Sequence, residues 1–490
     1  MSKRFFRMTL IVVVFALISQ VIMFAQDDGL VTVTIINTSD EHGWLQPFIP
    51  YGSSEIKGGA ANVSGWWLQN ENYDPDNMLL LSGGDNWTGP SISTWFEGEP
   101  VVEAFNLMDY DASAIGNHEF DFGREVMEQR FSEAKYPYLA ANIRYADTGE
   151  LVDFAQPYIV IDVNGVGVGV IGLTSTSTPT TTHPKNVSDL VFVNYEDTLR
   201  EFVPQMRDDG AEIIVVLSHA CMGELTVLSG RVSDLVDAMF AGHCNELGSR
   251  MVDDVSVMGS GSNWHSYARL TISYDTVSAE IVEMEQSVVD VAYDTDDGNP
   301  VEPDAEITTL VDDWQRRVDE QLSVEIGYTD SGIARRSAMM GNWVTDSWLW
   351  AFPYADVAIT NWGGFRQDIS SGAIAINDIV GLLPFDNYIV EVEITGEQLL
   401  ENLSCCGGAV GGTIYSIDGE EFDPDAIYRV LISDFLYYGG DGYLFGEQDP
   451  EGYNTGVHWR QPVIDYTESL GTDEDNPLEN YLDVETRIEN

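Results

Sequence analysis

Five short polar clusters follow apolar, strand-like runs in the first half of the chain, and this repeated arrangement constrains the fold more than any other feature. Four of the seven histidines lie in these clusters. Side chains placed just beyond the carboxyl ends of strands converge at one edge of a sheet, where α/β proteins generally build their sites. The clusters therefore predict one shared polar site, and they read Asp40-Glu41-His42, Gly84-Asp85, Gly116-Asn117-His118-Glu119-Phe120-Asp121, Ser218-His219 and Gly242-His243-Cys244-Asn245.

An α/β domain is expected over residues 30–295, where short apolar runs alternate with longer mixed segments. Residues 158–163 and 166–173 are two such runs joined at Asn164-Gly165, a turn sequence typical of a hairpin, so the sheet should not be purely parallel. Strands are also expected before four of the polar clusters, at residues 31–36, 78–81, 213–217 and 235–240.

With 490 residues the chain exceeds what one hydrophobic core usually serves, so a second domain is expected. An acidic stretch at 294–304 contains Gly and Pro, should bury nothing, and marks the boundary. We expect a linker and connecting helix at 296–325, because apolar residues recur at helical spacing over 305–322.

The second domain should span residues 326–470 and mix helices with strands. A helix is expected near 342–350, and strands are expected at 357–359, 389–394 and 428–432. The remaining residues, 471–490, are acidic and should form a loose tail.

Aspartate and glutamate outnumber lysine and arginine by 81 to 22, which gives a formal net charge of -59. Such a surface repels nucleic acid polymers and anionic membranes, so neither is expected as a partner. We interpret the acidity as a solubility adaptation to a salty environment, where repulsion among carboxylates is screened. An anionic substrate would then have to be drawn in by local metal and arginine charge.

The N-terminus has the layout of a secretory signal peptide over residues 1–25. Lys3, Arg4 and Arg7 precede an apolar run at 10–24, and Ala25-Gln26 follows it. This predicts export to the periplasm, the cell surface or the medium. An uncleaved run would instead act as an anchor, although it is short for a full membrane span, and membrane contact is expected only in that case.

Four cysteines are too few for a disulfide scaffold in a chain of this length. The vicinal pair Cys405-Cys406 is expected to be two buried thiols, because it could close only as a strained ring. Cys221 lies two residues after His219, and Cys244 directly follows His243. If both histidines bind one metal ion, a Cys221–Cys244 disulfide becomes a reasonable hypothesis, and two free thiols are the alternative.

The polar clusters contain aspartate, histidine and asparagine, whose oxygen and nitrogen atoms suit Zn, Mn, Co or Fe. A carboxylate such as that of Asp85 has two oxygens and can bridge two ions. Two divalent ions clamp a phosphate, lower the pKa of a shared water molecule and stabilise both the attacking and the leaving oxygen. Two divalent metal ions are therefore the expected cofactors, and the clusters provide what phosphoester hydrolysis needs.

The order of the five clusters resembles the calcineurin-like metallophosphoesterases, and specifically the secreted 5'-nucleotidase family, over nearly all of residues 31–445. This resemblance implies a four-layer α/β/β/α N-terminal domain followed by a mixed-sheet α+β domain that recognises substrate. It implies one ion held by Asp40, His42, Asp85 and Asn245, and a second ion held by Asp85, Asn117, His219 and His243.

The same resemblance makes His118 and Asp121 the catalytic dyad. In the family the histidine contacts the phosphate and assists the leaving oxygen, while the aspartate orients and charges the ring. A histidine beside a dication is costly to protonate, and a carboxylate partner offsets that cost.

Motifs in the second half resemble the family's substrate-binding segments. Asn361-Trp362-Gly363-Gly364-Phe365-Arg366 matches Asn-x-Gly-Gly-x-Arg, in which the arginine binds phosphate oxygens and the glycines allow close approach. Phe385 and Phe435 match the aromatic pair around the base, and Asp441 matches the aspartate for the ribose hydroxyls. Stacking is worth about 1 to 3 kcal/mol per base and tolerates any base, which predicts broad nucleotide acceptance.

One segment departs from the family pattern. The family has an arginine and then a glutamate before a Leu-Gly-Asn helix start, whereas here Arg335-Arg336 is out of step and the glutamate is absent. Either arginine could meet phosphate, and Arg336 is the favoured assignment.

The resemblance implies an exported hydrolase that releases phosphate from nucleoside 5'-monophosphates by attack of a metal-activated water, acting as a monomer or weak dimer. Rotation of the C-terminal domain about the linker helix is a further implication. The alternatives are a UDP-sugar hydrolase, a 2',3'-cyclic-nucleotide phosphodiesterase/3'-nucleotidase, a more distant thiosulfohydrolase-like enzyme, and a non-catalytic surface binding protein.

Overall fold

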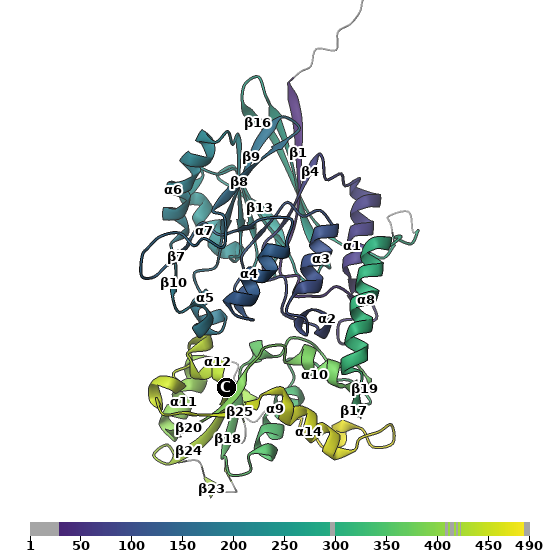
Figure 1. Ribbon diagram of the computed structural model, residues 1–490, viewed down its shortest axis with the longest axis vertical. Coiled ribbons are helices and arrows are strands. Elements are labelled where there is room, and N and C mark those ends of the chain that lie inside the picture. Colours follow the sequence, from purple (N-terminus) through teal and green to yellow (C-terminus); the bar gives the residue numbers. More distant parts are fainter. Residues whose placement is uncertain are drawn as a thin grey trace, which may run out of the picture.

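Two lobes make up the molecule in Figure 1, an N-terminal lobe coloured purple to teal and a C-terminal lobe coloured green to yellow. The computed structural model describes residues 29–294, 299–406 and 423–484, together with three two-residue strands between 410 and 421. The expected signal segment, residues 1–25, lies outside the described residues. Within the described part of the chain, no helix combines the length and the apolar composition needed to cross a membrane.

A six-stranded mixed sheet forms one half of the N-terminal lobe. Four consecutive strands, up to one edge of the sheet, run parallel, and the last two strands along the chain add antiparallel at the other edge. In spatial order the strands are β16 (Glu280–Asp290), β15 (Ser266–Asp275), β1 (Leu30–Thr38), β4 (Met78–Ser82), β5 (Ala112–Ala114) and β6 (Tyr138–Leu139).

A second six-stranded sheet packs against the first. The predicted hairpin is confirmed, because β8 and β9 pair antiparallel across Asn164-Gly165, where both residues have positive φ values of 55° and 88°. In spatial order the strands are β13 (Leu247–Val252), β14 (Val255–Ser260), β12 (Ala238–Ala241), β11 (Ile213–Ser218), β9 (Val166–Leu173) and β8 (Tyr158–Val163).

Helices cover the outer faces of both sheets. Alternate residues of facing strands, such as Ile35, Leu81, Val168 and Val215, fill the core between the sheets. Helices α1 (Ala60–Trp66), α3 (Glu99–Leu107) and α8 (Ala305–Leu322) pack on the first sheet, and α6 (Tyr195–Asp208) and α7 (Met222–Val232) pack on the second (Figure 1). The expected four-layer α/β/β/α arrangement is confirmed.

The connecting helix α8 has the predicted bounds. Asp304 caps its first turn by accepting hydrogen bonds from the backbone N–H groups of Glu306 and Ile307. Val311 and Trp314 lie on its buried face against the N-terminal lobe. The acidic stretch at 294–304 was expected to bury no side chain. That expectation is wrong for Val301, which is buried with 6% exposure.

A five-stranded mixed sheet forms the centre of the C-terminal lobe, with the order β21 (Val410–Gly411), β18 (Val357–Thr360), β24 (Ile427–Ser433), β20 (Tyr388–Thr395) and β25 (Tyr453–His458). Only β18 and β24 pair parallel among these strands. Helices α9 (Ala338–Ala351), α10 (Ile376–Leu382) and α14 (Arg460–Leu470) pack on one face, and α11 (Gly396–Cys405), α12 (Asp434–Tyr437) and α13 (Phe445–Gln448) pack on the other. The mixed-sheet α+β expectation is confirmed.

The tail is not loose over its described part. Leu478 is fully buried in the C-terminal core, and the Glu479 carboxylate accepts a hydrogen bond from the Ser331 N–H at 2.8 Å. The prediction of a loose tail is therefore wrong for residues 471–484. It was based on acidic composition, whereas a few apolar side chains are enough to dock the segment. Residues 485–490 lie outside the described residues.

Both cysteine pairs are disulfide-bonded. The Cys221–Cys244 hypothesis is confirmed. The expectation of two buried thiols at Cys405 and Cys406 is wrong, because these residues form a vicinal disulfide at the exposed end of α11.

Candidate metal and substrate site

The predicted ligands lie at the carboxyl ends of strands from both sheets of the N-terminal lobe. Asp40 and His42 follow β1, Asp85 follows β4 and Asn117 follows β5. From the second sheet, His219 follows β11, and His243 and Asn245 follow β12. Because the two sheets pack face to face, their polar edges meet on one side of the lobe, where the C-terminal lobe also docks (Figure 1).

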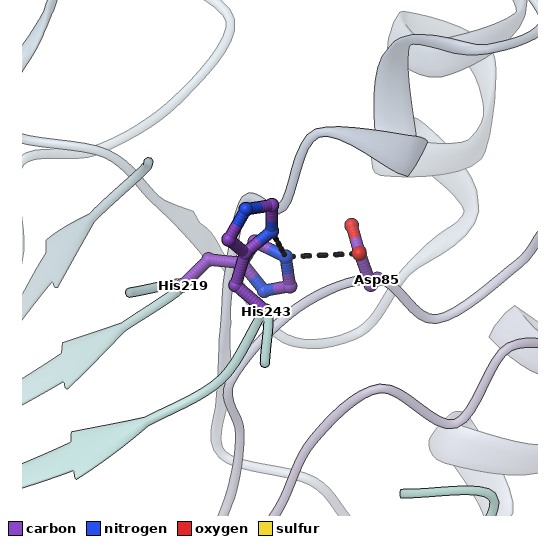
Figure 2. Close-up of side chains that lie close together, drawn as sticks. All are labelled: Asp85, His219 and His243. Atoms are coloured by element: carbon purple, nitrogen blue, oxygen red, sulfur yellow. Dashed lines mark hydrogen bonds and ion pairs between the residues drawn. The ribbon is translucent and has the colours of Figure 1, made fainter. Parts of the chain in front are cut away.

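Asp85, His219 and His243 form a tight cluster (Figure 2). The Asp85 Oδ2 atom lies 2.9 Å from His219 Nε2, and His219 Nε2 lies 3.3 Å from His243 Nδ1. His219 Nδ1 is fixed by the carbonyl of Gly83 at 2.8 Å, which leaves Nε2 facing the cluster.

A second cluster shares Asp85. It consists of Asp40, His42 and Asp85, and one ligand atom from each lies within 4.8 Å of the others. His42 Nε2 and Asp40 Oδ1 are 3.9 Å apart. Since Asp85 belongs to both clusters, its two carboxylate oxygens can face two neighbouring positions, as predicted for a bridging ligand.

The donor set of these clusters fits divalent cations. The buried Oδ1 atoms of Asp40 and Asn117 have no hydrogen-bond partner among the described residues, although Asn117 Nδ2 donates to the Thr181 carbonyl. Buried polar atoms are normally satisfied, so an unpaired oxygen beside two imidazole clusters indicates a position for a cation. Asn117 and Asn245 line the same cavity as His42, Asp85 and His243.

Burial and mutual contact shift the pKa values in the cluster. Burial opposes protonation of His219, yet Asp85 and its hydrogen bond raise the His219 pKa to about 10. Burial raises the pKa of Asp40 to about 6. Burial and the charge of His219 lower the pKa of His243 to about 4. The acidic side chains thus attract positive charge to this cluster, and His243 is kept neutral, the form that ligates metals.

Left-handed backbone conformations occur at five of the seven predicted ligands. Non-glycine residues rarely adopt positive φ, and such residues gather at functional sites. The φ values are 54° for Asp40, 46° for His42, 61° for Asp85, 69° for His243 and 54° for Asn245. Tight turns at the strand ends therefore aim these side chains at a common point.

Glu119 joins two of these turns. Its fully buried carboxylate accepts hydrogen bonds from the backbone N–H groups of Asp85, Asn86 and Gly116 at 2.9, 2.7 and 2.6 Å. These bonds fix the loop that carries Asp85 against the loop that carries Asn117 and His118.

The predicted dyad is in contact. His118 Nδ1 lies 2.7 Å from Asp121 Oδ2, and the Asp121 carboxylate also accepts hydrogen bonds from Thr88 and Thr182. Burial opposes protonation of His118, but the charges of Asp121 and Asp85 raise its pKa above the usual value. The Nε2 atom of His118 lies 3.9 Å from Asp85 Oδ2, so the dyad borders the candidate metal cluster.

The C-terminal lobe supplies the opposite wall of the same cavity. The lining residues that were predicted to bind substrate are Asn361, Gly363, Gly364, Arg366, Phe385, Phe435 and Asp441. Asn361 Nδ2 donates to Asp441 Oδ2 at 2.6 Å, which couples the Asn-x-Gly-Gly-x-Arg loop to the predicted ribose-binding aspartate. Phe385 stacks on His118 with ring centroids 5.6 Å apart.

The assignment of Arg336 does not hold. Its side chain is exposed and does not line the cavity. Arg335 is partly buried, its Nη1 donates to the Arg366 carbonyl at 3.1 Å, and it lines a neighbouring cavity together with Arg366. The backbone N–H of Arg335 donates to Asp368 Oδ1 at 2.8 Å, and its guanidinium group contacts the backbone of Arg366, which lines both cavities.

One loop of the N-terminal lobe was missed by the sequence reasoning. Thr181, the last residue of the short helix α5 (Thr178–Thr181), lines the cavity beside the predicted substrate residues, and so do Thr182 and His183. His183 Nε2 lies 3.7 Å from Asp434 Oδ2 in the other lobe. The only signal in the sequence was a histidine outside the five clusters, at the end of a threonine-rich run.

Comparison with known proteins agrees with this architecture. Residues 321–413 match the family described as 5'-nucleotidase, C-terminal domain. The 5'-nucleotidase of Vibrio cholerae is 23% identical over 516 residues, which cover 90% of this chain and 91% of the relative. UshA of Escherichia coli is 24% identical over 512 residues, with 90% and 92% coverage. The C-terminal part of the chain thus matches the 5'-nucleotidase C-terminal domain, and relatives over most of the chain include a 5'-nucleotidase. These relatives support the prediction of an enzyme of the metallophosphoesterase type.

Several relatives are longer proteins. Cell wall protein Lmo0130 of Listeria monocytogenes is 25% identical over 506 residues, and the match covers 84% of this chain and 64% of that protein. The chain spans 37% and 33% of two relatives from Bacillus subtilis.

Solved structures confirm the two-domain fold. A crystal structure of a 5'-nucleotidase precursor from Thermus thermophilus superposes with a TM-score of 0.81 at 23% identity, covering 94% of this chain and 99% of that one. The sulfate thiohydrolase SoxB of the same genus superposes with a TM-score of 0.74 at 16% identity, covering 90% and 94%. At these identities the likeness concerns the fold alone.

Proposed function

We propose that this chain is an exported two-metal phosphomonoester hydrolase that releases phosphate from nucleoside 5'-monophosphates. One observation carries the proposal. A single cavity is lined by candidate metal ligands and His118 from one lobe and by Phe385, Phe435 and Arg366 from the other. A site that combines cation ligands with aromatic rings suits a substrate that has a phosphate at one end and a base at the other.

The proposed ligand sets share Asp85. Asp40, His42, Asp85 and Asn245 would hold one cation, and Asp85, Asn117, His219 and His243 would hold the other. When bound, such cations neutralise phosphate charge and lower the pKa of a coordinated water molecule.

His118 and Asp121 would manage the proton on the leaving oxygen. Asp121 accepts the Nδ1 hydrogen, which leaves Nε2 free to donate toward the cavity. The charges of Asp121 and Asp85 raise the pKa of His118 and so favour the protonated form of this donor. Asp121 is itself held by the hydroxyls of Thr88 and Thr182, so the ring is oriented before the substrate arrives.

Residues of the C-terminal lobe would select the substrate. Arg366 would pair with phosphate oxygens through its planar guanidinium group. Phe385 and Phe435 would hold the base, and the Asn361–Asp441 pair would meet the ribose hydroxyls. Local positive charge of this kind is needed because the formal net charge of the chain is -59 and would otherwise repel an anionic substrate.

A UDP-sugar or 2',3'-cyclic nucleotide is the second candidate substrate class, because the same aromatic residues would accept either. A thiosulfohydrolase-like activity has the fold similarity to SoxB in its favour, but the two phenylalanines favour a base over a small sulfur compound.

The proposal is tested by phosphate release from AMP, UDP-glucose, 2',3'-cyclic AMP and ribose 5-phosphate, with and without a chelator. We expect AMP to be the preferred substrate and the activity to require a divalent metal ion. Equal rates on AMP and ribose 5-phosphate, or activity that survives complete metal removal, would contradict the proposal. The His118→Ala variant is the control for contaminating phosphatases.

A further inference from the structure

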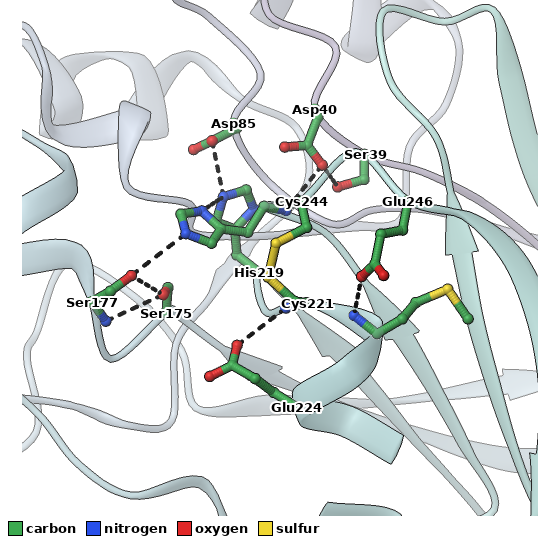
Figure 3. The surroundings of a disulfide bond; sticks show 12 residues. Ser39, Asp40, Asp85, Ser175, Ser177, His219, Cys221, Glu224, Cys244 and Glu246 are labelled. Atoms are coloured by element: carbon green, nitrogen blue, oxygen red, sulfur yellow. Dashed lines mark hydrogen bonds and ion pairs between the residues drawn. A yellow bond between two sulfur atoms is a disulfide. The ribbon is translucent and has the colours of Figure 1, made fainter. Parts of the chain in front are cut away.

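The Cys221–Cys244 disulfide joins the two loops that carry the histidine ligands (Figure 3). Cys221 precedes α7 and lies two residues after His219. Cys244 lies between His243 and Asn245 in the loop after β12. The covalent link therefore spans the ends of two neighbouring parallel strands at the point where the candidate cluster forms.

The loop around Cys244 has a costly backbone conformation. Both neighbours of Cys244 have left-handed φ values, 69° at His243 and 54° at Asn245. Such conformations persist only where the surroundings hold them. Residues 244 to 247 are exposed, so burial contributes little to holding this part of the loop.

A small number of hydrogen bonds supplement the disulfide. The Cys244 N–H donates to the Gly242 carbonyl at 2.8 Å, and the His243 N–H donates to Asp40 Oδ2 at 3.1 Å. The Glu246 carboxylate accepts from the Met222 N–H at 2.6 Å, at the start of α7. The disulfide and Glu246 thus both anchor this loop to the start of α7. Only the disulfide does so covalently.

We propose that the Cys221–Cys244 disulfide is a positioning element of the metal centre. It holds the His243 ring against the His219 ring, with His243 Nδ1 3.3 Å from His219 Nε2, so that the two imidazoles can bind one cation together. The inference rests on the proposed metal centre. The disulfide lies beside two ligands of one proposed set, His219 and His243, but beside only Asn245 of the other set. The cation held between the two histidines should therefore depend on the disulfide more than the cation held by Asp40 and His42 does.

The test is a titration with Co²⁺ followed by its visible absorption, which reports histidine ligation independently of catalysis. The Cys221→Ser/Cys244→Ser variant is compared with the unmodified chain. The matched control is Cys405→Ser/Cys406→Ser, which removes the other disulfide, in the C-terminal lobe. Serine also removes thiols that would themselves bind Co²⁺.

We expect the unmodified chain and the control to bind two Co²⁺ ions alike. In the Cys221→Ser/Cys244→Ser variant, one of the two ions should bind at least tenfold more weakly while the other changes less than threefold. Two unchanged affinities would overturn the inference. An equal loss at both ions would also overturn it, because that is the result of general destabilisation. Failure of the unmodified chain to bind Co²⁺ would instead overturn the proposed metal centre.

If the serine pair does not fold, the control variant offers a second route. A phosphine reductant and water convert its remaining disulfide into two thiols and the phosphine into its oxide. Co²⁺ affinity is then measured after removal of the phosphine, with the thiols blocked by alkylation. A selective loss of one ion supports the positioning role, and unchanged binding of both ions contradicts it.

Discussion

Arg366 of the C-terminal lobe donates from Nη2 to the imidazole of His42 in the N-terminal lobe, with Nη2 3.1 Å from Nε2. Burial lowers the pKa of His42 well below its usual value, and the neighbouring guanidinium lowers it further. A proposed phosphate-binding residue and a proposed metal ligand thus meet across the interface between the lobes. Neither lobe contains a complete site, so catalysis should depend on how the lobes dock.

Replacement of His118 by alanine should lower kcat and leave metal binding intact. The side chain is proposed to move a proton and is not in either ligand set, and general acid catalysis typically contributes about 10² to 10⁴-fold. Steady-state kinetics with AMP and metal analysis of the same preparation check this. Asp121→Asn should reproduce part of the loss, whereas a loss of bound metal in His118→Ala would assign the histidine to the ligands.

Replacement of Phe435 should mainly raise KM for nucleotides. Loss of one stacking ring is worth about 1 to 3 kcal/mol, which corresponds to roughly 5 to 150-fold in KM. Phe435→Leu is the informative variant, because it keeps an apolar side chain and removes the ring. Ribose 5-phosphate has no base and serves as the internal control. Equal effects on both substrates would argue against stacking.

Replacement of Gly116 by alanine should abolish metal binding. A Cβ at this position would lie 2.2 Å from Asp85 Oδ1, so the shared ligand would have to move. The control is Gly223→Ala in α7, where a Cβ meets no atom within 4 Å and the helix should gain about 0.5 to 1 kcal/mol of stability. Metal content after gel filtration distinguishes the two, and a metal-replete Gly116→Ala protein would be inconsistent with Asp85 as a ligand.

A contact between the lobes is formed by Lys185 and Tyr438. Lys185 Nζ lies 3.6 Å from the centre of the Tyr438 ring, beside the His183 and Asp434 contact. A double-mutant cycle with Lys185→Gln and Tyr438→Leu should give a coupling energy of about 0.5 to 1 kcal/mol in the free energy of unfolding. Strictly additive effects would show that the pair does not hold the lobes together.

The stability of the N-terminal lobe should depend on the protonation of Asp111. Burial raises the pKa of this carboxyl to about 6, although it accepts a hydrogen bond from the Leu80 N–H. Between pH 3.8 and 6 the folded state therefore binds more protons than the unfolded state, so the free energy of unfolding falls as pH rises through this window.

Asp111→Asn should remove that dependence. The variant should be more stable than the unmodified protein by roughly 1 to 2 kcal/mol above pH 6, and similar to it near pH 4. Thermal unfolding across this range is the measurement. A constant difference between the two proteins at all pH values would show that Asp111 does not titrate as described.

Local sequence patterns were sufficient for most secondary structure and for locating the candidate ligands. The apolar period over residues 305–322 determines α8, and Asn164-Gly165 determines the β8–β9 turn, because each depends on neighbours in the chain. The polar residues that follow buried strands could be predicted to lie near one another, because the carboxyl ends of parallel strands meet at one edge of a sheet.

Other features required the folded chain. The choice between Arg335 and Arg336 depends on which side chain faces Arg366, and the docking of Leu478 depends on a groove built by distant residues. The participation of His183 depends on the docking of the two lobes, and the pairing of Cys221 with Cys244 depends on the pairing of β11 with β12 in one sheet. The sequence by itself determined which residues could bind cations and where strands and helices form. Only the tertiary structure decided which side chains share one cavity, because distances between segments far apart in the chain are set by the packing of whole layers.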